Sequence, residues 1–168
     1  LGARLLDMLG DSDEARTHFK AGVSLLQDPE GERVEEAYRE FKAAYAISKS
    51  PKILGNMGFC AMRLERDGEA IEAYSQYLRE VPDIDADERA QITRGVSTLS
   101  VGVVRVTIKV NAPAGSKVIV SDVRTPVKGE KITNAYPFEV AAGQSSVSVS
   151  LGVRSGHHVM TVRSAGFV

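Results

Sequence analysis

The spacing of apolar residues changes once along this chain, and the change predicts two differently built parts. From Asp13 to about Ser100, apolar and small residues recur every three or four positions, which is the period of an amphipathic α-helix. From Val103 onward the period falls to two, and β-branched residues and glycines take over. We therefore expect a helical part followed by a β part, with the boundary near Gly102.

Residues that start or stop helices divide the first part into five expected helices. Their ranges are about 13–28, 32–48, 51–65, 68–80 and 86–100. Pro29 and Gly31 break the chain after the first helix, Pro51 begins the third, and Pro82 ends the fourth. We expect residues 1–10 to form a partial helix.

Alternating residues divide the second part into five expected strands. Their ranges are about 103–110, 117–122, 136–141, 145–151 and 157–163. Valine and isoleucine alternate with polar residues from Val104 to Val110, and valines alternate with serines from Val147 onward, so each strand should bury one face. Glycines separate the strands at intervals typical of a small antiparallel β-sandwich. The expected fold class is α+β.

The helical part contains an internal repeat. Three positions recur after 33 residues, because Ala37, Phe41 and Ala44 correspond to Ala70, Tyr74 and Tyr77. Gly22 corresponds to Gly58, and each glycine should allow two helices to touch. The first repeat is about three residues longer, and the surplus falls in the turn around Pro29, where insertions cost little loop entropy.

These positions resemble the tetratricopeptide repeat (TPR) family. Residues 51–82 match its pattern without a gap, including Asn56, Gly58, Tyr74 and Pro82, whereas residues 15–48 match more loosely and lack the terminal proline. The resemblance implies a repeat domain over residues 1–101, with repeats at about 13–48 and 51–82.

A repeat array of this kind needs a terminal helix with one polar face, and residues 86–100 suit that role. The expected apolar stripe consists of Ala90, Ile92, Val96 and Leu99. The residues expected to stay in solvent are Asp87, Glu88, Arg89 and Arg94.

Residues 102–168 resemble a PEGA-type β domain. The resemblance rests on the Pro113 to Gly115 turn, the strand that starts at Lys117, and the last hairpin leading to Phe167, although residues 123–135 lack the usual glycine–proline spacing of the family. It implies a small antiparallel sandwich. It also implies an exported protein of the bacterial periplasm or cell envelope, with the cytoplasm as the alternative.

The two parts carry opposite net charges, although the net charge of the whole chain is only −1. The first 100 residues hold 13 Lys and Arg against 19 Asp and Glu, a net charge of −6, and the rest hold 8 against 3, a net charge of +5. Neither part has a dense basic run interleaved with aromatic residues. We therefore expect no nucleic-acid partner.

Cysteine content and hydropathy bear on whether the protein is disulfide-stabilised, metal-binding or membrane-spanning. The single cysteine, Cys60, excludes an intrachain disulfide framework and leaves a soft metal without its usual ligands. No run approaches the roughly 18–20 apolar residues of a membrane-spanning helix, and Arg4 and Asp7 interrupt the first ten residues where a signal peptide would be apolar. The chain opens without Met, which suggests a fragment of a longer protein.

We expect no catalytic, cofactor or metal site. The chain has no nucleophile elbow, phosphate-binding loop, dinucleotide fingerprint or zinc-protease motif. His157 and His158 should face opposite sides of a strand and could not bind one metal together. Cys60 is interpreted as a core residue. His18 is interpreted as a polar surface residue, with no carboxylate three or four positions further along its helix. The serines from Ser145 to Ser150 are interpreted as the solvent-exposed face of a strand.

The TPR resemblance instead implies a groove that binds a protein or peptide partner. The groove positions of that family fall here on Arg16, Phe19, Lys20, Val23, Gln27, Lys52, Asn56, Phe59 and Arg63. The set is basic and partly apolar, so an acidic or C-terminal segment would be a suitable ligand. The alternative is that these are ordinary solvated positions on a mainly structural surface.

The sequence thus favours a non-catalytic scaffold for protein–protein interaction, whose β domain would contact a second surface. One alternative is a glycan or cell-wall binding module on a helical spacer. It is disfavoured because the aromatics after residue 100 are only Tyr136, Phe138 and Phe167, and at least two look like core residues. Another is an outer-membrane assembly factor, whose groove would accept extended apolar segments.

Overall fold

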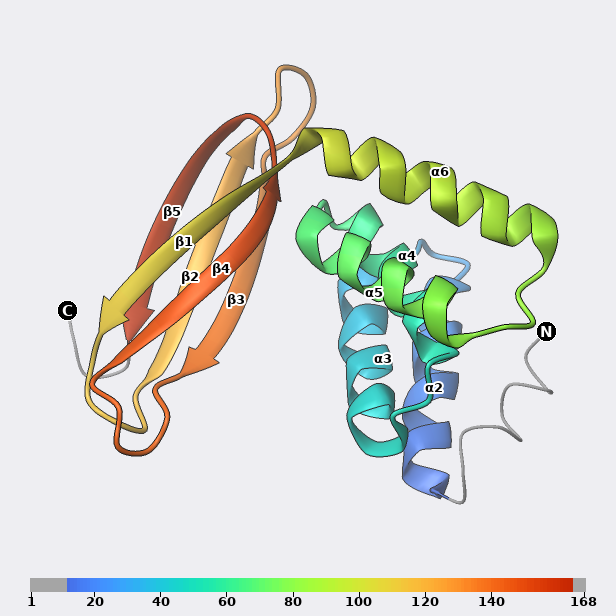
Figure 1. Cartoon of the computed structure of the whole chain (residues 1–168), viewed down its shortest axis with the longest axis horizontal. Helices are drawn as coiled ribbons and strands as arrows, with labels where there is room; N and C mark the ends of the chain where they lie inside the picture. Colours follow the sequence, from blue (N-terminus) through green and yellow to red (C-terminus); the bar gives the residue numbers. More distant parts are fainter. Residues whose placement is uncertain (1–11, 165–168) are drawn as a thin grey trace. The chain divides into compact units, whose positions relative to one another are not determined.

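A computed structural model of the protein describes residues 12–164 and confirms the expected α+β class (Figure 1). Within this range five helices precede five strands. The chain divides into two compact units that meet between Gly102 and Val103, called here the helical unit and the β unit. The partial helix expected at residues 1–10 lies outside the described residues.

The helices follow the expected ranges closely. Their bounds are α2 Asp13–Leu26, α3 Val34–Ser48, α4 Ile53–Arg63, α5 Asp67–Glu80 and α6 Ala86–Gly102. The Ser12 hydroxyl caps α2 by accepting from the Ala15 amide at 3.3 Å. α5 ends as predicted, because Val81 precedes a proline and is therefore extended. None of the described helices has both the length and the apolar composition needed to cross a bilayer.

The repeated glycines pack against the repeated aromatic residues. A Cβ atom at Gly58 would lie 2.5 Å from Cδ1 of Tyr74, and one at Gly22 would lie 2.8 Å from Cε1 of Phe41. The same contact therefore closes both antiparallel helix pairs, α2 with α3 and α4 with α5. The expectation that these glycines let helices touch is confirmed.

Helix α6 differs in two details from the expected capping helix. Ile92 is its only buried residue, and Ala90 is exposed rather than part of the apolar stripe. Arg89 is half-buried rather than solvated, and its guanidinium donates to the carbonyls of Leu78 at 3.0 Å and Val81 at 3.1 Å. The reason is that the C-terminal end of α5 has carbonyl groups without helical partners, which a neighbouring arginine can satisfy.

The five strands form two antiparallel sheets. Their bounds are β1 Val103–Asn111, β2 Lys117–Thr125, β3 Ile132–Glu139, β4 Ser146–Arg154 and β5 His157–Ser164. One sheet pairs β1 with β4, and the other has the order β3-β2-β5. β3 begins four residues earlier than expected, because Ile132 pairs with Arg124 and Ala135 with Ser121.

The sandwich core lies between the two sheets. Val120 and Tyr136 from the three-stranded sheet pack with Val149, Leu151 and Val153 from β4. Phe138 packs against this cluster, so both aromatic residues described after residue 100 belong to the core as expected, and Phe167 lies outside the described residues. The alternation of valine and serine along β4 thus separates core from solvent.

Candidate functional site: a groove on the helical unit

The helical unit has a groove of about 470 Å³ between four of its helices. α2 and its C-cap residue contribute Phe19, Val23 and Gln27, and the start of the next pair contributes Lys52, Gly55, Asn56 and Phe59. The remaining lining comes from Tyr74 and Tyr77 of α5 and from Glu88, Gln91 and Ile92 of α6. Six of the nine sequence-predicted groove residues therefore come together in one place.

Helical spacing explains how each helix turns several side chains toward one groove. Phe19 and Val23 are four residues apart and share one face of α2, and the C-cap residue Gln27 follows after the same interval. Glu88, Gln91 and Ile92 are related by three and four residues, so they likewise share one face of α6. α6 thus acts as the third wall of the groove as well as the terminal helix of the unit.

The floor of the groove is apolar and belongs partly to the core. Phe19 is buried, and its ring packs against Phe41 with centroids 5.5 Å apart. Tyr74 is buried as well, because it covers Gly58. Val23 and Phe59 are half-buried and present the apolar surface that a ligand could reach. Phe19 was expected at the binding surface, and its main contact is instead with the core.

Three carboxamide side chains line the groove, one from each wall. Gln27 directly follows the last residue of α2, Asn56 comes from α4 and Gln91 from α6. Their side chains make no hydrogen bond with any other residue from 12 to 164. A carboxamide has both donors and acceptors, so these three groups can bond both the N–H and the C=O of a peptide backbone.

The groove is less basic than the sequence suggested. Lys52 is the one cation in its lining, and its Nζ lies 3.3 Å from Oδ2 of Asp83. Glu88 is also in the lining, where it accepts a hydrogen bond from the Tyr77 hydroxyl at 3.1 Å. Pairing and a neighbouring acid thus reduce the positive charge that an acidic ligand would meet.

The other three expected cations do not line the groove. Nη1 of Arg63 lies 2.7 Å from Oε2 of Glu32, and Arg63 also lies over the Phe59 ring at 5.7 Å. Nη1 of Arg16 lies 3.4 Å from Oδ1 of Asp13. Lys20 is exposed.

Sequence reasoning missed the contributions of α5 and α6 to the groove. The spacing of Glu88, Gln91 and Ile92 is a usable signal, since Ile92 belongs to the expected apolar stripe and the other two flank it at helical intervals. The sequence assigns Tyr74 and Tyr77 to helix packing alone. Each tyrosine ring contacts a glycine, Tyr74 at Gly58 and Tyr77 at Gly55, and each also lines the groove.

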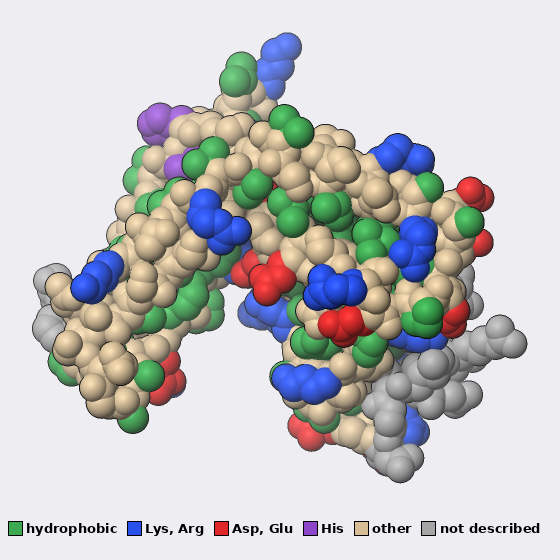
Figure 2. Space-filling model, in the orientation of Figure 1, with side chains coloured by type: hydrophobic (Ala, Val, Ile, Leu, Met, Phe, Trp, Pro, Cys, Tyr) green, Lys and Arg blue, Asp and Glu red, His purple; other side chains and the backbone are tan. Residues whose placement is uncertain are grey.

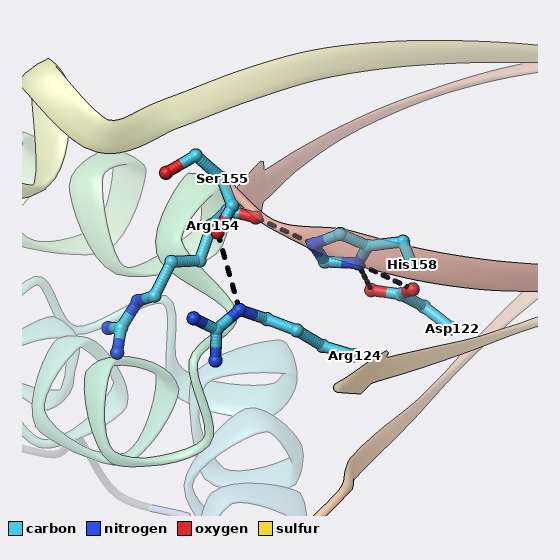
Figure 3. Close-up of polar contacts among 5 residues, drawn as sticks. All are labelled: Asp122, Arg124, Arg154, Ser155 and His158. Carbon is cyan, nitrogen blue, oxygen red and sulfur yellow. Dashed lines mark hydrogen bonds and ion pairs between the residues drawn. The ribbon is translucent and has the colours of Figure 1, made fainter. Parts of the chain in front are cut away.

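The β unit holds a second polar cluster, which joins three strands (Figure 3). Nδ1 of His158 lies 2.8 and 3.0 Å from the two carboxylate oxygens of the buried Asp122, and Nε2 lies 2.6 Å from the carbonyl oxygen of Arg154. Arg124 donates from Nε to the Ser155 carbonyl at 3.4 Å. Both ring nitrogens of His158 thus have oxygen partners, which makes this cluster a structural contact.

The histidines do not form a metal site in the part of the chain that the structure describes. His157 is exposed and His158 is half-buried, as expected for neighbours on a strand. Between residues 12 and 164 no group of three or more His, Cys, Asp or Glu could hold a metal ion. His18 is half-buried, and its Nδ1 lies 2.7 Å from Oε2 of Glu40, a carboxylate that α3 supplies and that residue spacing along α2 could not reveal.

Cys60 lies in the core of the helical unit, as the sequence predicted. Burial raises the pKa of its thiol to about 12. Because the thiolate is the nucleophilic form, this cysteine is unreactive near neutral pH while the unit is folded.

Comparison with protein-family models, with curated proteins and with solved structures finds no match to this chain. A functional proposal therefore rests on the geometry and chemistry of the groove.

Proposed function

We propose that the chain is a non-catalytic scaffold whose helical unit binds an extended peptide segment of a protein partner in the groove. The observation that carries this proposal is that three carboxamides, Gln27, Asn56 and Gln91, line the same groove as a set of apolar side chains. An extended segment leaves backbone N–H and C=O groups for these side chains, whereas a helical ligand would already have used its own. An extended ligand therefore fits the groove best.

The lining also indicates the chemistry of that ligand. Val23, Phe59 and Ile92 favour apolar ligand side chains at intervals. Lys52 is paired with Asp83, and Glu88 lies in the same lining, which makes a strongly acidic ligand less suitable than the sequence suggested. The bound segment in this proposal is extended and largely uncharged. A groove of this size buries less than a standard protein interface, so the affinity should be modest.

Family and location remain part of the proposal. The antiparallel helix pairs and their glycine–aromatic contacts support the tetratricopeptide resemblance, which stays a prediction. A periplasmic or envelope location rests on the PEGA resemblance of the β unit, and the cytoplasm stays the alternative. The β unit of the proposed scaffold contacts a surface other than the partner bound in the groove.

One alternative function is supported by a specific observation. The apolar floor of the groove suits an assembly factor of the outer membrane that holds extended apolar segments of its clients. The glycan-binding alternative has less support, because Tyr136 is buried and Phe138 packs against the sandwich core rather than forming an exposed platform.

A peptide selection tests the proposal directly. Peptides selected from a random phage-displayed library on the full chain would be measured by calorimetry against the wild type and the double variant Asn56→Ala, Gln91→Ala. Two lost backbone hydrogen bonds should weaken binding about tenfold. The control variant Gln144→Ala removes an exposed carboxamide from the β unit and should bind as the wild type does. Equal affinities for all three proteins would contradict the proposal.

A further inference from the structure

Within the described residues, the β-sandwich is closed along one side and open along the other. Val149, Leu151 and Val153 of β4 are 3%, 7% and 4% exposed. Their partners in register on β1, Ile108, Val106 and Val104, face the same core. Yet Ile108 and Val106 are only half-buried, and Val104 is 48% exposed. The sequence pattern is alike on both strands, so the difference reflects what covers them.

The three-stranded sheet shows the same asymmetry. Tyr136 of β3 and Val162 of β5 pair with Val120 from opposite sides, and all three residues face the core. Tyr136 is 3% exposed, whereas Val162 is 42% exposed. β3 and β4 lie in contact, so that side of the sandwich is closed. The uncovered side is the one that β1 and β5 share.

We call this region the open seam and define it by the core-facing residues Val104, Val106 and Ile108 of β1 and Met160 and Val162 of β5. Between residues 12 and 164 β1 pairs with β4 alone and β5 with β2 alone, so each has a free edge. One sheet has two strands where the other has three. A further strand beside β1 would cover the seam and would pair the free edge.

The composition of the edges indicates which side would accept a strand. β3, at the closed side, contains Pro137, which lacks a backbone N–H and interrupts pairing at an edge. β1 and β5 contain no proline and no acidic residue. The outward side of β1 carries Arg105 and Lys109, and Figure 2 shows basic but no acidic side chains along this strand.

The same charges argue against a second copy of this chain as the occupant. Antiparallel pairing of two β1 strands centred on Thr107 would place Arg105 opposite Lys109 twice. Like charges directly opposite one another destabilise a strand pair. A strand with acidic residues at its outward positions would instead form opposite-charge pairs there.

We propose that the open seam binds an extended strand of a partner protein, in which apolar residues alternate with acidic or uncharged polar residues. The strand pairs through its backbone with the free edge of β1. Its apolar residues cover the seam, and its acidic residues lie beside Arg105 and Lys109. This site is separate from the groove of the helical unit and does not depend on the function proposed for that groove.

The test uses the full chain and a synthetic probe. The probe is a peptide of the same nine-residue length as β1, in which valine alternates with glutamate and threonine, and the control peptide has lysine in place of glutamate. Titration of the ¹⁵N-labelled protein should shift the amide signals of β1 and β5. The lysine peptide should bind about tenfold more weakly, because two cross-strand charge pairs become repulsive.

A charge reversal supplies the matched variants. The double variant R105E, K109E should reverse the preference, so that the lysine peptide binds more tightly than the glutamate peptide. The control K128E reverses an exposed charge outside the strands and should keep the wild-type preference. Unshifted signals outside β1 would establish that the variants remain folded.

Three results would overturn the proposal. The first is the absence of amide shifts with millimolar glutamate peptide. The second is a set of shifts confined to β3 and β4, or to groove residues such as Asn56. The third is dimerisation of the chain through β1 without any peptide, detected by sedimentation at increasing protein concentration. Shifts at β1 and β5 that follow the charge reversal would support it.

Discussion

At the scale of single residues, packing of the helical unit depends on two glycines beneath aromatic rings. Gly58 lies under Tyr74 and Gly22 under Phe41, with no room for a Cβ atom at either position. Gly95 on α6 has no neighbour within 4 Å of the corresponding position. A side chain at Gly58 or Gly22 would therefore disturb packing, whereas a side chain at Gly95 would change helix propensity alone.

We predict that Gly58→Ala lowers the free energy of unfolding by about 1–3 kcal/mol, because the added methyl group forces the Tyr74 ring or the helix backbone to move. The control Gly95→Ala should raise it by about 0.5–1 kcal/mol through helix propensity alone. Urea denaturation followed by circular dichroism measures both changes. Equal effects at the two positions would remove the packing role assigned to Gly58.

The tyrosines that line the groove predict a loss of stability at alkaline pH. Burial raises the pKa of both Tyr74 and Tyr77 to about 12, and the neighbouring Glu88 adds to the effect at Tyr77. In the unfolded chain tyrosine ionises near pH 10. The raised values therefore contribute stability that is complete below about pH 10 and is lost as the pH rises toward about 12.

The measurement is the urea midpoint as a function of pH from about 9 to 11.5. The wild-type midpoint should fall across this range, and the fall should be shallower in the double variant Tyr74→Phe, Tyr77→Phe, which cannot ionise at either position. A variant with the wild-type slope would show that other groups cause the alkaline transition.

Single-residue roles were predictable from the sequence where they follow a repeat. The repeat pattern selects both Gly58 and Tyr74 as positions of helix packing. The contact between His158 and Asp122 joins residues 36 positions apart, and it depends on the register between β2 and β5, which residue spacing does not reveal. His18 and Glu40 show the same limit across two helices.

At the scale of elements, α6 is attached to α5 through an arginine as well as through apolar packing. The Arg89 guanidinium donates to the carbonyls of Leu78 and Val81 at the C-terminal end of α5. Ile92 supplies the buried apolar contact. Asp85 caps the start of α6 by accepting from the backbone amides two and three residues further on, at 2.9 and 3.3 Å. These contacts hold the third wall of the groove in place.

We predict that Arg89→Met costs about 1–3 kcal/mol of stability, because the carbonyls of Leu78 and Val81 lose charged donors while the aliphatic stem is kept. The exposed Arg94 lies on the same helix, and Arg94→Met should change stability by less than about 0.5 kcal/mol. Thermal and urea denaturation of both variants provide the comparison. Equal losses would contradict the capping role of Arg89.

Element types and approximate bounds were predictable because the periods of 3.6 and 2 are long and clear on either side of Gly102. The start of β3 was not, because Asn134 is a polar residue that faces the interior and breaks the alternation on which the prediction relied. The role of Arg89 was missed for a related reason, since a charged residue on a terminal helix is normally solvated.

At the scale of the whole molecule, each unit has its own apolar core. Phe41, Ile53 and Cys60 belong to the core of the helical unit, and Val120 and Leu151 belong to that of the β unit. The units also carry opposite net charges. Separate cores are what independently folding domains require.

We therefore predict that residues 1–102 fold without the β unit. The isolated segment should give a helical circular dichroism spectrum and a cooperative thermal transition, because its buried residues lie within the segment. A spectrum of an unfolded chain, or a gradual loss of signal on heating, would show that the β unit is required for folding.

About half of the groove could be predicted from the sequence. The residues of α2 and α4 followed from the resemblance to a repeat family, whereas those of α5 and α6 required the positions of four helices relative to one another. Charge was the least predictable property, because the partners of Lys52 and Arg63 lie 31 positions away from each. For this reason we propose an extended, largely uncharged ligand in place of the acidic ligand that the sequence favoured.

Whether the groove binds an extended peptide is tested most directly by mapping a selected peptide on the ¹⁵N-labelled full chain by nuclear magnetic resonance. We predict shifts of backbone and side-chain amide signals at Gln27, Asn56 and Gln91, with peptide–protein nuclear Overhauser effects to Phe59 and Ile92. Such a result would place an extended ligand in the groove. Shifts confined to the outer face of α3, or to the β unit, would contradict the assignment of the groove as the peptide-binding site.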